Sequence, residues 1–167
     1  LAIAQSEYRI ALASEIRLNA EQADRDTLEF PAGLLEDPSP RVQAVIDVQR
    51  RLFEVRRKSQ ADALAALDEK ARQMNQQIAG LESLQRINRS RIASLSGEAG
   101  DYRTLFSEGL GDNQHLRELE RQVLQYRGEN AQHAAEVAQL RSQISENGLQ
   151  QEIQRQEYHQ KVGEELK

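Results

Sequence analysis

Two long runs of heptad-spaced residues constrain this chain more than any other feature of its sequence. In each run the spacing alternates between three and four residues, which is the a and d pattern of a helix that supercoils around a partner. The first run is Leu64, Leu67, Ala71, Met74, Ile78, Leu81, Gln85, Asn88, Ile92 and Leu95. The second is Leu116, Leu119, Val123, Tyr126, Asn130, His133, Val137, Leu140, Ile144 and Asn147. This periodicity predicts two long helices and argues against disorder, which so polar a composition would otherwise suggest.

The prolines mark where helix is interrupted. All three fall in one stretch, at Pro31, Pro38 and Pro40, and proline removes an amide donor and pushes the preceding residue out of helix. Ser39 before Pro40 is typical of an N-cap followed by proline at the first helical position. After Pro40 and before the first heptad run, Val45, Val48, Leu52 and Val55 keep the three-and-four spacing but in a phase shifted from that run. We predict an N-terminal helix over residues 1–28, a proline-rich connector over 29–40 and a long helix over 41–106.

Glycines mark a reversal in the second half of the chain. They gather at Gly97, Gly100, Gly109 and Gly111, between the two heptad runs. We therefore predict a hairpin tip over residues 107–112 and a long return helix over 113–167, with the whole chain as one helical domain. Asn147-Gly148 is a turn dipeptide within the return helix, and the sequence leaves open whether the helix kinks there.

Folding the chain back at Gly109 brings like seam positions together. Asn88 then meets Asn130, Gln85 meets His133, and the paired layers run as far as Leu95 and Val123. Because a buried amide without a partner costs about 1–3 kcal/mol, other registers would be destabilised at several layers. The fold class predicted is all-α, a long antiparallel coiled-coil helical hairpin with an additional N-terminal helix. A parallel homodimer would also match each polar layer to itself, so the seam leaves that alternative open.

Charge and composition argue against several classes of function. The net charge is −5 and Arg is interleaved with Glu, so no basic stripe suits a nucleic-acid backbone. Cysteine is absent, and His115, His133 and His159 share no metal-ligand spacing. The sequence contains no nucleophile elbow or phosphate loop. Its neighbouring acidic residues lie on predicted helices, where no cleft is expected to make them catalytic. We expect no enzymatic activity, metal, cofactor, nucleic acid or small-molecule ligand.

The start of the chain is also informative. No apolar run approaches the roughly 20 residues of a membrane span. The chain opens on Leu1 in helix-forming sequence, so we expect a piece of a longer protein whose membrane anchor, if it has one, lies elsewhere.

Two stretches resemble a known family. The first is AQSEY over residues 4–8 with LASE over 12–15 and LEFP over 28–31, and the second is YRTLFSEGLGD over 102–112 running into LRELER. Together they resemble the helical region of HlyD-type periplasmic adaptors, the membrane fusion proteins of type I secretion systems. The resemblance is closest to the subgroup that serves exporters of proteases, lipases and haemophores.

The resemblance implies a function. The chain would be the arm of an adaptor that bridges an inner-membrane ABC transporter to a TolC-like outer-membrane channel. The parent protein would lie in the periplasm, anchored in the inner membrane of a Gram-negative bacterium, and would self-associate as a hexamer. The alternative is a homodimeric coiled-coil spacer with no channel partner. The exported substrate and the identities of the transporter and channel are not specified by the sequence.

The resemblance also implies a partner-binding site at the tip. Drug-efflux adaptors place there an Arg, a Leu four residues later, and a Ser or Thr seven beyond that. Leu105 matches the Leu, but Asp112 stands at the third position and Asp101 at the first, so we assign the Arg role to Arg103. The predicted contacts are Arg103, Leu105, Leu110 and Asp112. The sequence leaves open whether the tip leucines, with Phe106 between them, cap the hairpin's own core or stay exposed.

Overall fold

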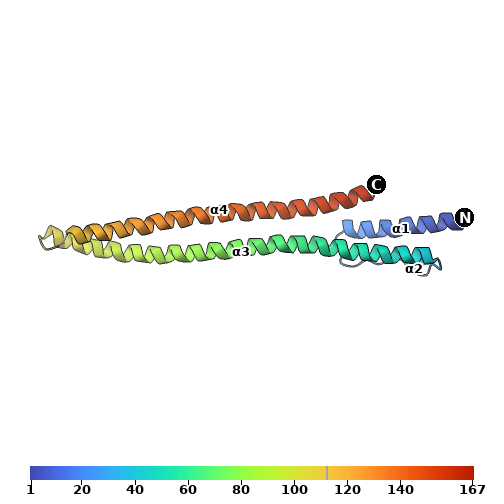
Figure 1. Cartoon of the computed structure of the whole chain (residues 1–167), viewed down its shortest axis with the longest axis horizontal. Coiled ribbons are helices and arrows are strands. Elements are labelled where there is room, and N and C mark those ends of the chain that lie inside the picture. Colours follow the sequence, from blue (N-terminus) through green and yellow to red (C-terminus); the bar gives the residue numbers. More distant parts are fainter. Residues whose placement is uncertain (112) are drawn as a thin grey trace. The chain divides into compact units, whose positions relative to one another are not determined.

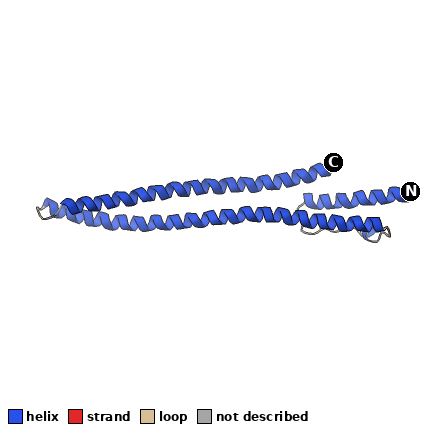
Figure 2. Ribbon diagram, viewed as in Figure 1, coloured by secondary structure: helices blue, strands red, loops and turns tan. Residues whose placement is uncertain are grey.

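The computed structural model describes residues 1–111 and 113–167, and nearly all of them are helical (Figure 1, Figure 2). The elements are α1 (Ala2–Gln22), α2 (Ala32–Leu35), α3 (Pro40–Ser107) and α4 (Asn113–Glu165). The two long helices, α3 and α4, form an antiparallel hairpin, and the described residues contain no strand, so the predicted all-α hairpin is confirmed. α4 stays helical through Asn147-Gly148. None of the helices in these ranges is both long and hydrophobic enough to cross a membrane.

The described residues divide into two compact units. Unit 1 comprises Leu1–Asp68 and Gly148–Lys167, so it contains α1, α2, the start of α3 and the end of α4. Unit 2 comprises Glu69–Asn147 and holds the heptad seams on either side of the tip.

The first helix is shorter than the sequence suggested. α1 ends at Gln22, so the predicted helix over residues 1–28 was wrong at its C-terminal end. Asp24 adopts φ 51°, the left-handed conformation that Asp tolerates better than most residues. The amide of Arg25 then donates to the carbonyl of Ala20 at 3.0 Å, which satisfies a helix-end carbonyl and stops the helix.

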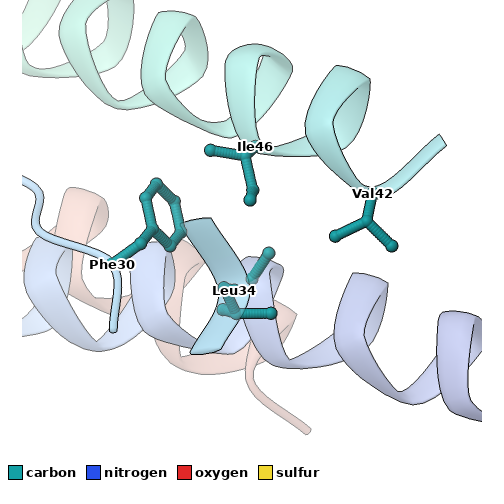
Figure 3. Close-up of a cluster of buried hydrophobic side chains, with 5 residues drawn as sticks. Phe30, Leu34, Val42 and Ile46 are labelled. Atoms are coloured by element: carbon teal, nitrogen blue, oxygen red, sulfur yellow. The ribbon is translucent and has the colours of Figure 1, made fainter. Parts of the chain in front are cut away.

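The connector is packed rather than extended. It contains the short helix α2, which the prediction of a connector over residues 29–40 missed. Phe30 and Leu34 from this segment pack with Val42 and Ile46 of α3, as Figure 3 shows, and Ala13 of α1 completes the cluster. All five are less than a tenth exposed, so this core holds α1 against the start of α3.

The start of α3 follows the sequence signal. The helix begins at Pro40, and the amide of Gln43 donates to the carbonyl of Ser39 at 3.1 Å. The Asp37 carboxylate accepts from the amide of Ser39 at 2.8 Å. The side-chain amide of Gln43 also donates to the Leu34 carbonyl at 3.1 Å, which ties the connector to the first turn.

A buried ion network joins α1, α3 and α4 within unit 1. The Glu21 carboxylate is fully buried and accepts from Arg17 Nη1 at 2.9 and 3.0 Å, while Arg56 Nε lies 3.5 Å from it. Arg56 Nη1 also contacts Glu165 Oε2 at 2.7 Å, and Arg17 donates to the side chain of Gln49. Burying an unpaired charge destabilises the folded state. Removal of one charged group from this network would therefore leave its buried partner uncompensated.

The polar layers of unit 2 pair differently from the prediction. Asn130 Nδ2 donates to the backbone carbonyl of Gln85 at 3.1 Å, and Asn88 Nδ2 donates to Glu129 Oε2 at 3.2 Å. At the predicted Gln85–His133 layer, His133 Nδ1 is buried without a hydrogen-bond partner, so no hydrogen bond from this nitrogen joins the two side chains. The antiparallel pairing is confirmed, but the amide side chains reach a neighbouring backbone or carboxylate oxygen instead of each other.

Candidate partner-binding site at the hairpin tip

The chain reverses at the tip through a glycine in the left-handed region. α3 ends at Ser107, and Gly109 has φ +76°. The amide of Gly109 donates to the carbonyl of Phe106 at 3.0 Å, and that of Leu110 donates to Leu105 at 2.8 Å. This is the Schellman arrangement, in which a residue without a Cβ lets the chain turn and satisfy the last carbonyls of the helix.

A second glycine brings the returning chain close to the end of α3. A Cβ at Gly111 would lie 3.1 Å from the Phe106 backbone nitrogen and 3.4 Å from Leu105, so a side chain there would require movement of the backbone. Of the predicted contacts, Asp112 lies outside the described residues, and its role remains a prediction.

The tip leucines, which the sequence left ambiguous, are exposed. Leu105 is 41% exposed, Phe106 50% and Leu110 64%. All three belong to the turn or to the last turn of α3, so the structure brings two of the predicted site residues, Leu105 and Leu110, together. Phe106 was not among the predicted contacts. Its signal was its place between them in sequence, next to the glycine turn.

Other residues close the core beneath the tip. Ala99, Leu116 and Leu119 are buried there, with Leu95 and Tyr102 packed against them. The prediction that paired layers run only as far as Leu95 was therefore wrong, because small and aromatic residues extend the packing toward the turn. The exposed tip side chains are consequently not needed to seal the hairpin.

An aromatic contact links the two helices just below the turn. The rings of Tyr102 and His115 have centroids 4.4 Å apart with a 58° tilt. His115 Nε2 also lies 3.6 Å from Glu98 Oε1. Contacts from both helices therefore support the backbone that presents the tip.

Arg103 is paired across the hairpin. Its Nη2 lies 2.9 Å from Glu120 Oε1, and the two side chains are 58% and 45% exposed. An ion pair this exposed contributes only about 0–1 kcal/mol. The guanidinium can therefore exchange Glu120 for a stronger acceptor at little cost. The tip thus presents an apolar surface with a cation beside it, and within the described ranges no group of His, Cys, Asp and Glu converges as a metal site would.

The whole chain matches a known family. A family model described as "AprE, long alpha-helical hairpin" matches residues 1–167. The chain is 28% identical over 151 residues to "Type I secretion system membrane fusion protein PrsE" of Rhizobium meliloti (strain 1021), covering 90% of this chain and 34% of that protein. It is 29% identical over 160 residues to "Alkaline protease secretion protein AprE" of Pseudomonas aeruginosa, covering 95% and 37%. The chain therefore spans about a third of the length of these relatives.

A solved structure shares the fold. The crystal structure of the soluble domain of LipC, a membrane fusion protein of a type I secretion system, superposes with a TM-score of 0.88. The match covers 97% of this chain and 76% of that one at 22% sequence identity. At this identity the likeness establishes the shared hairpin architecture.

Proposed function

This chain belongs to the AprE family of long α-helical hairpins, and we propose that it forms the periplasmic arm of a membrane fusion adaptor in type I secretion. In this proposal the arm bridges an inner-membrane ABC transporter to a TolC-like outer-membrane channel and catalyses no reaction. The full-length protein is anchored in the inner membrane and assembles as a hexamer. The names of its relatives support the adaptor role.

The exposed apolar tip is the observation that carries the proposal. Leu105, Phe106 and Leu110 lie around the Gly109 turn at the end of unit 2, and none of them fills the core beneath. Apolar side chains gathered in water around a tight turn favour a docking patch over a structural role. Leu110 is the most exposed of the three and would be buried most on docking.

The tip also indicates what the partner surface should contain. An apolar notch would receive Leu110 and Phe106, and a carboxylate or carbonyl oxygen at its rim would receive Arg103. Since Arg103 already has Glu120 as a weak partner, docking would replace an exposed ion pair with a less exposed one. Burial of the leucine would supply affinity, and the guanidinium would orient the arm.

The experiment replaces Leu110 in the full-length adaptor and measures export of the system's substrate from cells. Leu110→Ser should reduce secretion severalfold while leaving adaptor abundance and helicity unchanged. The matched control is Leu84→Ser, because Leu84 is also exposed, at 47%, but lies within α3, far along the helix from the turn. Normal secretion by Leu110→Ser, or equal losses from both variants, would contradict docking through the tip.

A further inference from the structure

Unit 1 carries a second heptad stripe on α3, and most of it stays exposed among the described residues. Val48, Leu52 and Val55 are 48%, 39% and 65% exposed, and with the partly buried Val45 they keep the three-and-four spacing of a and d positions. The core of unit 1 uses a different face of the same helix, the one that carries Val42, Ile46 and Phe53. α3 therefore presents one seam inward and a second one to solvent through Val48, Leu52 and Val55; we call these three residues, with Val45 at the edge of the core, the α3 stripe.

α4 exposes a shorter stripe with the same spacing. Leu149 and Ile153 are 60% and 50% exposed, and Gln156 and Gln160, also exposed, continue the pattern along the helix. We call Leu149, Ile153, Gln156 and Gln160 the α4 stripe. Leucine and isoleucine at consecutive seam positions, both at least half exposed in the part of the chain that the structure describes, can serve as knobs of a coiled-coil contact with another helix.

The charges beside the two stripes are of opposite sign. In heptad terms, Arg51 and Lys58 occupy the g positions beside the α3 stripe, while Glu152 and Glu157 occupy the g and e positions beside the α4 stripe. All four belong to exposed residues, and Lys58 also pairs with Asp62 one turn along α3, at 2.8 Å. Charges at e and g select partner helices, because opposite charges attract and like charges repel across the seam.

We propose that the α3 stripe of one copy of this chain packs against the α4 stripe of a second copy. Pairing α3 with α3 would place Arg51 and Lys58 against the same cations, and pairing α4 with α4 would oppose Glu152 and Glu157. Only the mixed pairing buries apolar residues on both sides and joins cations to anions. The partner of this surface is therefore another copy, through a specified helix.

This contact deepens the self-association in the proposed function, yet it can be tested without channel or transporter. Each copy carries both stripes, so the same contact can form twice per copy, as a closed symmetric assembly requires. The contact uses residues of unit 1 alone and none of the tip. Loss of the contact and loss of tip docking are therefore separable results.

Cysteine crosslinking between two differently tagged chains tests the pairing. The chain has no native cysteine, so Leu52→Cys in one chain and Ile153→Cys in the other are the only reactive thiols. Facing seam positions bring Cβ atoms near disulfide reach. On mild oxidation the mixed-tag dimer should form severalfold more than in a control mixture of Glu54→Cys and Arg155→Cys, which are exposed but off the stripes.

Two outcomes would overturn the proposal. One is a mixed-tag yield no greater than that of the control. The other is a Leu52→Cys chain that crosslinks to itself as strongly as to the Ile153→Cys chain, which would show α3 paired with α3.

A charge exchange tests the selectivity. Arg51→Glu in the Leu52→Cys chain should lower the mixed-tag yield severalfold, and Glu152→Lys in the Ile153→Cys chain should restore it. High salt should lower the yield of the unmodified pair, since exposed charges are screened. Failure of the second substitution to restore crosslinking would count against the assignment of these charges.

Discussion

Removing the Glu21 carboxylate should destabilise the protein far more than removing an exposed one. Its side chain is fully buried, and those of Arg17 and Arg56 are 6% and 19% exposed. In Glu21→Ala, Arg17 would keep Gln49 and, more distantly at 3.9 Å, Glu165, whereas Arg56 would keep Glu165 at 2.7 Å. Breaking a buried pair costs about 3–5 kcal/mol, and the surviving Arg56 contact places this variant near the lower end, about 3 kcal/mol.

The assay is denaturant unfolding followed by circular dichroism. The control is Glu82→Ala, which removes a partner of Arg141 at 3.0 Å where both side chains are exposed, and it should cost about 0–1 kcal/mol. Replacing the buried pair as a whole, with Arg17→Met and Glu21→Leu together, should recover most of the loss, because no unpaired charge remains on α1. Equal losses from Glu21→Ala and Glu82→Ala would refute the reasoning.

Three further substitutions test the backbone and the interior. Gly109→Ala should lower the free energy of unfolding by about 1 kcal/mol, since the left-handed penalty of about 1–2 kcal/mol outweighs the gain from a stiffer unfolded chain. Gly80→Ala should raise it by about 1 kcal/mol, because this helical glycine has open space where the Cβ would go, and thermal melts of the pair should shift in opposite directions. Burial, followed by the nearby Glu21 carboxylate, raises the pKa of Tyr158 above its ordinary value of 10.0. The resulting stability is fully present below about pH 10 and is lost as the pH rises through the folded pKa, so melts at rising pH should show a loss in the native chain that Tyr158→Phe lacks.

The heptads and prolines predicted most of the fold because they report directly on which face is buried and where helix must stop. The spacing from Leu64 to Leu95 implied a supercoiled helix, and Pro40 marked the start of α3. The end of α1 was not predictable in the same way. It depends on the left-handed Asp24 and on packing of the connector through Leu34, which are contacts between residues distant in sequence.

The tip shows why a site is harder to predict than a helix. Gly109 indicated the turn. Leu105 and Leu110, however, are hydrophobic residues of the kind found in cores, yet both are exposed. The sequence could not show whether these leucines are buried or exposed, because heptad spacing does not indicate at which residue the packing between two helices ends. In the structure Tyr102 packs at a tilt against His115 and closes the core before the tip leucines are reached.

The most direct test of the central claim places a photo-crosslinking amino acid at Phe106 of the full-length adaptor, in cells that carry the whole export system. Phe106 is half exposed beside the Gly109 turn, so the substitution disturbs no core contact. We predict a covalent adduct between the adaptor and the outer-membrane channel from Phe106, and much less from the control position Leu84, which is 47% exposed within α3. No adduct with the channel from Phe106, or equal adducts from both positions, would contradict the account.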